Sequence, residues 1–410
     1  MRPFNLEFME EFKIVTLGGP EEKKEEQADF TIEKKDDYNP PRKRFIIIPL
    51  IILFVVVALV VINVITTYSD YDLENSWERK DAAESQYVPI KNNLLKYSTD
   101  GVFYTTYSGG LIWNYTYDMT NPSIDTCNNY IVIYDKKGNE IDVFSTSGFV
   151  TTIHTNTPIM DAQISNHGTV AALLQENNTS YLQMYDTMGT ILAAGEIHPE
   201  NSGYPVSIAL SSNGTRLMVS IINLNEGNIN SNVVFYDFSS AGKQEVDNIV
   251  ASYSYLNMVI PKVDYLEGDK AVAFGDNEII LYNNNSKATV LKELFLSDQI
   301  KSVCYNDSYI GYVTEELNDE GEETNNLTIY NLFGFKCCSK EIDDSYEDIQ
   351  IMSNDEVALI SGEKLAIYNM QGFKKFSYSF DENIYCVIPG RTLHKYYLVT
   401  ENSTDEIHLK

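Results

Sequence analysis

Two adjacent cysteines, Cys337 and Cys338, are the residues whose spacing most directly suggests chemistry in this sequence. Such a pair raises the hypothesis of an oxidoreductase. The chain has five cysteines, an odd number, without a C-x-x-C or Cys/His spacing. This pattern fits neither a disulfide framework nor a zinc site. We therefore expect free and mostly buried thiols.

The other candidates for catalysis or metal binding are weaker. None of the motifs G-x-S-x-G, H-E-x-x-H, G-x-G-x-x-G and G-x-x-x-x-G-K-[ST] occurs. Two acidic loops, Glu315–Thr324 and Asn223–Asn232, offer oxygen ligands for Ca²⁺ but lack the spacing of a calcium-binding loop. We predict no catalytic, cofactor-binding or metal-binding residues and no cofactor. The histidines are widely separated in the sequence: His154, His167, His198, His394 and His408.

A sequence repeat forms the elements that must position any such residue. Each copy has a few apolar residues, an aromatic residue, Asp or Asn, a short turn with Gly, and a second alternating run, as in "LQMYDTMGTIL" (Leu182–Leu192). The copies follow one another at intervals of roughly 40 to 50 residues, which is typical of β-propeller blades with four antiparallel strands. The marker residues of the copies are Tyr104, Phe144, Tyr185, Tyr236, Tyr282, Tyr330, Tyr368 and Leu409.

One unit shows the four strands in full. We predict strands at Ile159–Ser165, Thr169–Gln175, Tyr181–Tyr185 and Thr190–Glu196, separated by turns rich in Asn and Gly. The repeated aromatic residue is expected to pack between blades, and the Asp/Asn-x-x-Gly segment to make the hairpin to the outermost strand.

Eight markers favour eight blades, with seven as the alternative. The chain ends at "EIHLK", a third strand without a fourth, and we predict that "YVPI" (Tyr87–Ile90) supplies the missing strand and closes the ring. In the same scheme Gly334 makes the turn before Cys337, so the cysteine pair begins an outermost strand. A cofactor near the central axis would lie far from it, which disfavours the oxidoreductase hypothesis.

A charge-free run from Phe45 to Ile65 follows Arg42, Lys43 and Arg44. As a helix it would be about 31 Å long, close to the thickness of the bilayer hydrocarbon. We predict a retained transmembrane signal-anchor helix over residues 45–66, embedded in the lipid bilayer. Because the flanking positive charges favour the inside, residues 1–44 are expected in the cytoplasm and the C-terminal part outside it.

The remaining boundaries follow from composition. Residues 1–44 are dense in mixed charge and predicted to be largely disordered, although "FNLEFMEEFKIVTL" could form a short helix or dock on a cytoplasmic partner. Residues 67–86 are expected to be an acidic stalk and residues 87–410 the propeller. The formal net charge of −29 argues against nucleic acid as a partner, because nothing offsets repulsion from phosphates.

The repeats also resemble known families. The Gly109, Gly110 and Trp113 pattern is loosely similar to repeats of quinoprotein-like propellers, and some quinoprotein dehydrogenases hold an adjacent-cysteine disulfide against their cofactor. More specifically, "LIWNYTYDMTNPSIDTCNNYIVIYDKKGNEI", "GYPVSIALSSNGTRLMVS", "VVFYDFSSAGKQEVDNIV" and "PKVDYLEGDKAVAFGDNEIILY" resemble domain-of-unknown-function family 5711, across nearly all of residues 87–410. That resemblance implies a single-pass, propeller-bearing membrane protein of Gram-positive bacteria with no assigned activity.

Because propellers present many loops on a rigid frame and no catalytic constellation is evident, the sequence favours a non-catalytic binding or scaffold module of the cell envelope with an envelope protein as partner. The alternative is a small-ligand or quinone-dependent redox protein that uses the central channel. Polar or charged residues that converge on one channel mouth would favour this alternative.

Overall fold

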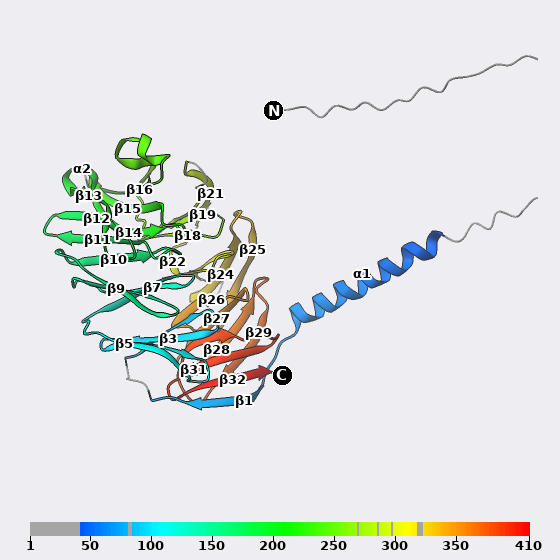
Figure 1. Cartoon of the computed structure of the whole chain (residues 1–410). Coiled ribbons are helices and arrows are strands. Elements are labelled where there is room, and N and C mark those ends of the chain that lie inside the picture. Colours follow the sequence, from blue (N-terminus) through cyan, green and yellow to red (C-terminus); the bar gives the residue numbers. More distant parts are fainter. Residues whose placement is uncertain are drawn as a thin grey trace, which may run out of the picture. The chain divides into compact units, whose positions relative to one another are not determined.

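The computed structural model describes residues 42–80, 84–225, 227–268, 270–284, 287–296, 298–317 and 323–410. Most of the predicted cytoplasmic tail therefore lies outside the described residues. The described part divides at Ala58 and Leu59 into two compact units. The first contains most of helix α1 (Arg42–Ile65), which precedes the strands in Figure 1.

Judged on the described residues, no helix combines the length and the apolar character needed to cross a membrane. The predicted span Phe45–Ile65 falls partly on residues 45–48, 59, 60 and 63, whose side chains lie outside the described part. The transmembrane anchor therefore stays a prediction.

The alternating runs of the sequence fold into eight four-stranded antiparallel sheets, which confirms an all-β, eight-bladed propeller. Blades 1 to 4 consist of β2 (Gln86–Ile90), β3 (Asn93–Ser98), β4 (Gly101–Thr106) and β5 (Leu111–Thr116); β6 (Pro122–Cys127), β7 (Tyr130–Asp135), β8 (Glu140–Ser145) and β9 (Gly148–His154); β10 (Ile159–Ile164), β11 (Val170–Glu176), β12 (Thr179–Tyr185) and β13 (Ile191–Ile197); and β14 (Tyr204–Leu210), β15 (Arg216–Asn225), β16 (Asn228–Asp237) and β17 (Ile249–Leu256).

Blades 5 to 8 follow the same plan until the last strand. They consist of β18 (Lys262–Leu266), β19 (Lys270–Phe274), β20 (Glu278–Asn283) and β21 (Thr289–Phe295); β22 (Ile300–Tyr305), β23 (Tyr309–Leu317), β24 (Glu323–Asn331) and β25 (Lys336–Ile342); β26 (Asp348–Ile351), β27 (Glu356–Ser361), β28 (Lys364–Asn369) and β29 (Lys374–Ser379); and β30 (Ile384–Pro389), β31 (Lys395–Thr400), β32 (Ser403–Leu409) and β1 (Tyr71–Glu78). Three short helices, α2 (Pro199–Ser202), η1 (Gly242–Gln244) and η2 (Val246–Asn248), lie in connections next to blade 4.

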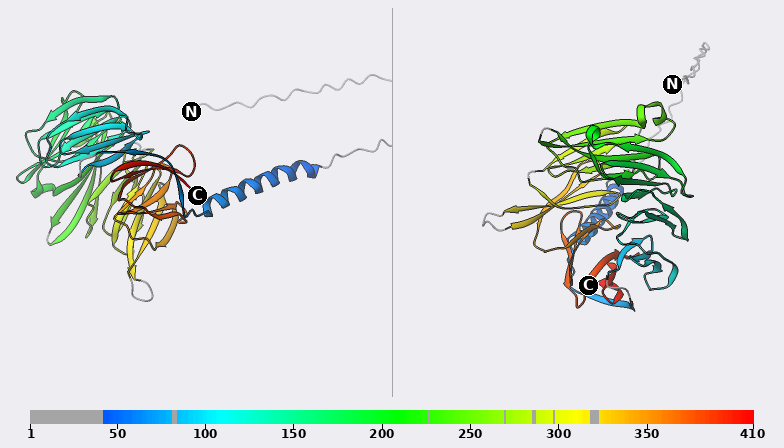
Figure 2. Two further views of the ribbon diagram at one scale, coloured as in Figure 1. Left: turned by 90° about the horizontal axis from the view of Figure 1, so that it is seen from below. Right: turned by 90° about the vertical axis from the view of Figure 1, so that its left-hand side faces the viewer.

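The first strand of each blade is the innermost one. First strands of neighbouring blades contact each other, for example β6 with β10, β10 with β14 and β14 with β18. Blade 1 meets blade 8 through β2 and β30, and Figure 2 shows cyan strands beside red ones. The second strands are buried along most of their length, as expected for strands between stacked blades.

All eight marker residues lie on third strands, and six of them are almost fully buried. The predicted hairpin after the marker is also present. In blade 6 the side-chain oxygen of Asn331 accepts a hydrogen bond from the backbone N–H of Phe335 (3.1 Å), and Gly334 has a φ of 75°. The same turn recurs at Asp186 and Asn369, because an Asx side chain and a glycine with positive φ together make a tight reversal.

The ring closes differently from the prediction. The "YVPI" segment forms β2, the first strand of blade 1, and does not complete blade 8. Instead, β1 lies beside β32, from Tyr71 opposite Leu409 to Glu78 opposite Ser403 (Figure 1). Residues 71–78, which were predicted to be part of a stalk, are therefore the outermost strand of blade 8. An outermost strand is mostly exposed on both faces, so its sequence, "YDLENSWE", has the polar composition of a linker.

We expect closure by β1 to dominate the stability of blade 8. Removing residues 1–80 should lower the free energy of unfolding by about 3 kcal/mol or more, because the seven paired positions of β1 lose a ladder of bonds that each contribute about 0.5–1.5 kcal/mol. Urea unfolding followed by circular dichroism measures the loss. A chain without residues 1–65 keeps β1 and is the matched control; equal midpoints for the two would contradict closure by β1.

Candidate functional site

Three partly buried carboxylates stand on innermost strands, and a fourth, Asp348 on β26, is exposed. Asp125 lies on β6, Asp161 on β10 and Asp264 on β18, and all three are partly buried. The Asp125 carboxylate accepts a hydrogen bond from the backbone N–H of Ile164 in blade 3 (2.7 Å). The Asp264 carboxylate accepts one from the Tyr305 hydroxyl of blade 6 (2.6 Å). These acids therefore link neighbouring blades at the central channel.

The protein environment makes these carboxylates reluctant to ionise. Burial, with smaller contributions from the charges of Asp264 and Asp161, raises the pKa of Asp125 from the ordinary 3.8 to about 7. Burial likewise raises the pKa of Asp161 and of Asp264. Asp125 of blade 2 and Asp264 of blade 5 line the same cavity, whereas Asp161 of blade 3 is not part of its lining.

A cavity of about 400 Å³ opens where β6, β10, β14 and β18 end. Its lining includes Asp125 and Asp264 together with Glu267 and Asp307 from the turns that follow first strands. We call these four residues the acidic mouth. Carboxylates from four elements around one opening favour a cationic group over a neutral or anionic one.

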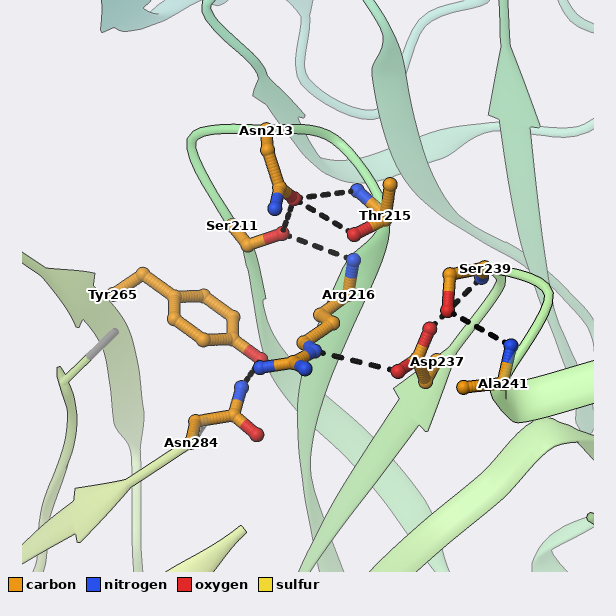
Figure 3. A network of polar contacts seen from close by, with 9 residues as sticks. All are labelled: Ser211, Asn213, Thr215, Arg216, Asp237, Ser239, Ala241, Tyr265 and Asn284. Carbon is orange, nitrogen blue, oxygen red and sulfur yellow. Dashed lines mark hydrogen bonds and ion pairs between the residues drawn. The ribbon is translucent and has the colours of Figure 1, made fainter. Parts of the chain in front are cut away.

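A buried ion pair supports the wall of this cavity (Figure 3). Arg216 Nε lies 3.4 Å from Asp237 Oδ2, and their side chains are only 15% and 2% exposed. The backbone N–H of Arg216 donates to Ser211 Oγ (2.9 Å), which fixes a turn that lines the acidic mouth. Because Asp237 neutralises Arg216, this cation does little to offset the negative potential of the mouth.

The opposite half of the same face has a different character. A cavity of about 900 Å³ lies between blades 7, 8 and 1, and its lining includes Lys91, Arg391, Tyr107 and Tyr397. The rings of Tyr107 and Tyr397 lie 4.6 Å apart, and burial raises the pKa of Tyr107 to about 12. This face of the propeller therefore has an acidic half on blades 2 to 6. The other half, where blades 7, 8 and 1 meet, has exposed cations.

The cysteine pair lies away from the channel. Cys337 and Cys338 are free thiols on β25, the outermost strand of blade 6, at the position predicted from Gly334. Burial raises the pKa of Cys338 to about 11 and also raises that of Cys337, so little thiolate is present near neutral pH.

The histidines and acidic loops do not converge with the mouth. His154, His198 and His394 each have a nearby partner: Glu140, Glu196 and the Tyr68 hydroxyl, respectively. Within the described part of the chain, no group of three or more His, Cys, Asp or Glu side chains is arranged to hold a metal ion. The Asn223–Asn232 loop is the tip of the β15–β16 hairpin, whereas residues 318–322 of the other loop lie outside the described residues.

The three channel aspartates were not predicted as site residues. A signal was present for Asp161, which lies inside the predicted first strand Ile159–Ser165, and "SIDTC" and "KVDYL" place an aspartate at a similar point of an alternating run. A charged residue in a strand that should line a central channel is costly unless it is paired or functional. The sequence alone did not show that these strands bring their aspartates to one opening.

The comparisons with known proteins concern the family and the fold. A model of a family of unknown function, DUF5711, matches residues 64–409. The chain belongs to this family. The match begins before β1, so it contains every strand of the closed ring. No curated protein matches the sequence.

Several solved structures share the fold at low sequence identity. BamB from Moraxella catarrhalis is 12% identical with a TM-score of 0.50, over 83% of this chain and all of that one. Sqt1 from Saccharomyces cerevisiae is 12% identical with a TM-score of 0.49, over 84% of this chain and 99% of that one. Apo AztD from Citrobacter koseri is 8% identical with a TM-score of 0.49, over 73% and 87%. At 12% identity the likeness to BamB shows the fold alone.

The raised pKa of Asp125 predicts a pH dependence of stability. Between pH 3.8 and about 7 the folded protein binds more protons at this site than the unfolded chain, so stability falls as pH rises through that window. Replacing Asp125→Asn should remove this part of the slope, as measured by urea unfolding at a series of pH values.

Asp186→Asn is the matched control. Backbone N–H groups of Thr190 and Met188 lower the pKa of Asp186, so Asp186 does not cause the fall in stability above pH 4. The Asp186→Asn variant should therefore keep this fall. Parallel pH profiles for the wild type and Asp125→Asn would contradict the assignment.

Proposed function

We propose that this protein is a membrane-anchored, non-catalytic binding module of the cell envelope whose acidic mouth receives a basic side chain of a partner protein. The observation that carries the proposal is the convergence of Asp125, Asp264, Glu267 and Asp307 on one cavity at the end of the channel. A cationic group entering it would offset the charges of Asp264 and Asp161, which add to the effect of burial on the pKa of Asp125.

The rest of the mouth suits binding better than catalysis. A rigid ring of eight sheets presents the turns around the channel on a fixed frame. The Arg216–Asp237 pair and the hydrogen bonds of Asp125 and Asp264 hold the walls in place. Such preorganisation lowers the entropic cost of binding. The described cysteines are free thiols, and the pair at 337–338 lies on an outer strand, so quinone-dependent redox chemistry is not part of the proposal.

A small cationic ligand is the second candidate. The acidic cavity of about 400 Å³ is within the size range of small-molecule sites, and charged residues at one channel mouth were the feature expected of this alternative. The two candidates differ in what a crosslinker captures, because a small ligand leaves no crosslinked protein.

The double variant Asp125→Asn, Asp264→Asn should reduce capture of the partner at least tenfold, equivalent to about 1.4 kcal/mol of binding free energy. The measurement is crosslinking in cells, followed by purification of the full-length protein and quantitative mass spectrometry. Arg391→Gln, on the opposite half of the same face, should capture the partner as the wild type does. Equal capture by the double variant would refute the role of the mouth.

Membrane anchoring and the extracytoplasmic location of the propeller belong to the same proposal. They rest on the charge-free run Phe45–Ile65 and on the cations that precede it in the sequence. Protease added outside intact spheroplasts should cleave the propeller and leave the N-terminal tail protected. Cleavage of the propeller only after lysis would overturn this topology.

A further inference from the structure

Blade 3 lacks a large side chain that most other blades carry on the outermost strand. The position is on the outermost strand of each blade. It is the residue that pairs with the third-strand residue three positions before the marker. From blade 1 to blade 8 it is occupied by Thr116, Ile153, Gly195, Tyr253, Leu294, Lys340, Tyr378 and Asn75. A Cβ atom built on Gly195 would meet no atom within 4 Å, so the space next to this glycine is open.

The missing side chain leaves a groove between blades 3 and 4. It has a volume of about 700 Å³ and lies between β13 and the residues that lead into β17. Its apolar lining includes Leu182, Met184 and Leu217, which are buried in the propeller. Tyr236 and Phe238, whose rings stack with centroids 6.2 Å apart, form another part of the wall.

The charges around the groove are all of one sign. Glu196 on β13 and Asp247 in η2 line it, and no Lys or Arg is among its described lining residues. Glu196 is 60% exposed, and in the part of the chain that the structure describes it pairs with His198 at 3.4 Å. The groove thus has an apolar floor with Asp247 beside it, and the Glu196 side chain lies on the other face of β13 from the space beside Gly195.

The backbone of β13 is also available. In its sheet, β13 pairs with β12 on one side and is the last strand on the other. An exposed strand edge offers unpaired N–H and C=O groups, and an extended peptide can bind by adding to such an edge.

We propose that this interblade groove binds an extended basic peptide segment of a partner protein. The segment lies along β13, one large apolar side chain fills the space beside Gly195, and Lys or Arg side chains meet Glu196 and Asp247. This contact is separate from the acidic mouth and goes beyond the function proposed above.

The test uses the full-length protein in detergent and a fluorescein-labelled peptide of alternating lysine and phenylalanine, with binding followed by fluorescence anisotropy. Gly195→Tyr, which introduces the residue found at this position in blades 4 and 7, should weaken binding at least tenfold because it fills the groove. Gly195→Ala should bind within twofold of the wild type. Glu196→Gln and Asp247→Asn should each weaken binding severalfold, by a factor that shrinks as salt is added.

Two further measurements keep the outcome interpretable. Thermal unfolding verifies that Gly195→Tyr is folded, and Ala193→Leu fills the same groove if it is not. A peptide of alternating glutamate and phenylalanine should not bind. The proposal is overturned if the wild type shows no saturable binding, or if both groove-filling variants bind normally. It is also overturned if binding responds only to the Asp125→Asn, Asp264→Asn double variant, an outcome that would leave the acidic mouth as the peptide site.

Discussion

The pairing of β1 with β32 is the interaction on which the ring depends. It joins residues more than 300 positions apart in the sequence, with Tyr71 opposite Leu409. Backbone bonds between Asp70 and Lys410 extend the contact by one residue, and the ring of Tyr71 packs 5.0 Å from Tyr378 of blade 7. Without this strand, blade 8 would end in a three-stranded sheet with β32 as an exposed edge. Closure therefore fixes the position of the last blade against the first.

A closed ring imposes one geometry on all first strands. Each strand must contact the first strands of its neighbours, so a polar side chain on one of them is held near the polar side chains of the others. Asp161 illustrates this, because it accepts a hydrogen bond from the Tyr134 hydroxyl of blade 2 (3.1 Å) and another from the backbone N–H of Ile208 in blade 4 (3.5 Å). The same contacts that unite the blades keep carboxylates in a poorly solvated channel. Burying these carboxylates costs free energy, which the other interactions of the closed fold offset.

Most blades carry a large side chain at one position of the outermost strand, and blade 3 has a glycine there. Large residues on third and outermost strands fill the interface, as in the contact of the Phe235 ring with the Tyr282 ring (5.0 Å). Where Gly195 replaces such a residue, the ring remains closed but a groove opens. A repeated architecture can thus create a distinct surface by deleting one side chain, because the neighbouring blades, and not that side chain, hold the interface in register.

By itself the sequence determined the class of fold, the blade repeat and the turn chemistry. The markers from Tyr104 to Leu409 lie on third strands, and Asn331 with Gly334 makes the predicted hairpin. These features are local, since alternation and Asx-Gly turns depend on residues close together in the chain. Ring closure was predicted wrongly, because β1 is exposed on both faces and its sequence lacks the alternation of a half-buried strand. The meeting of Asp125 with Asp264 and the gap beside Gly195 were decided only by the tertiary structure. Both depend on which blades become neighbours around the axis. Closure between β1 and β32 sets the arrangement of the blades in the ring.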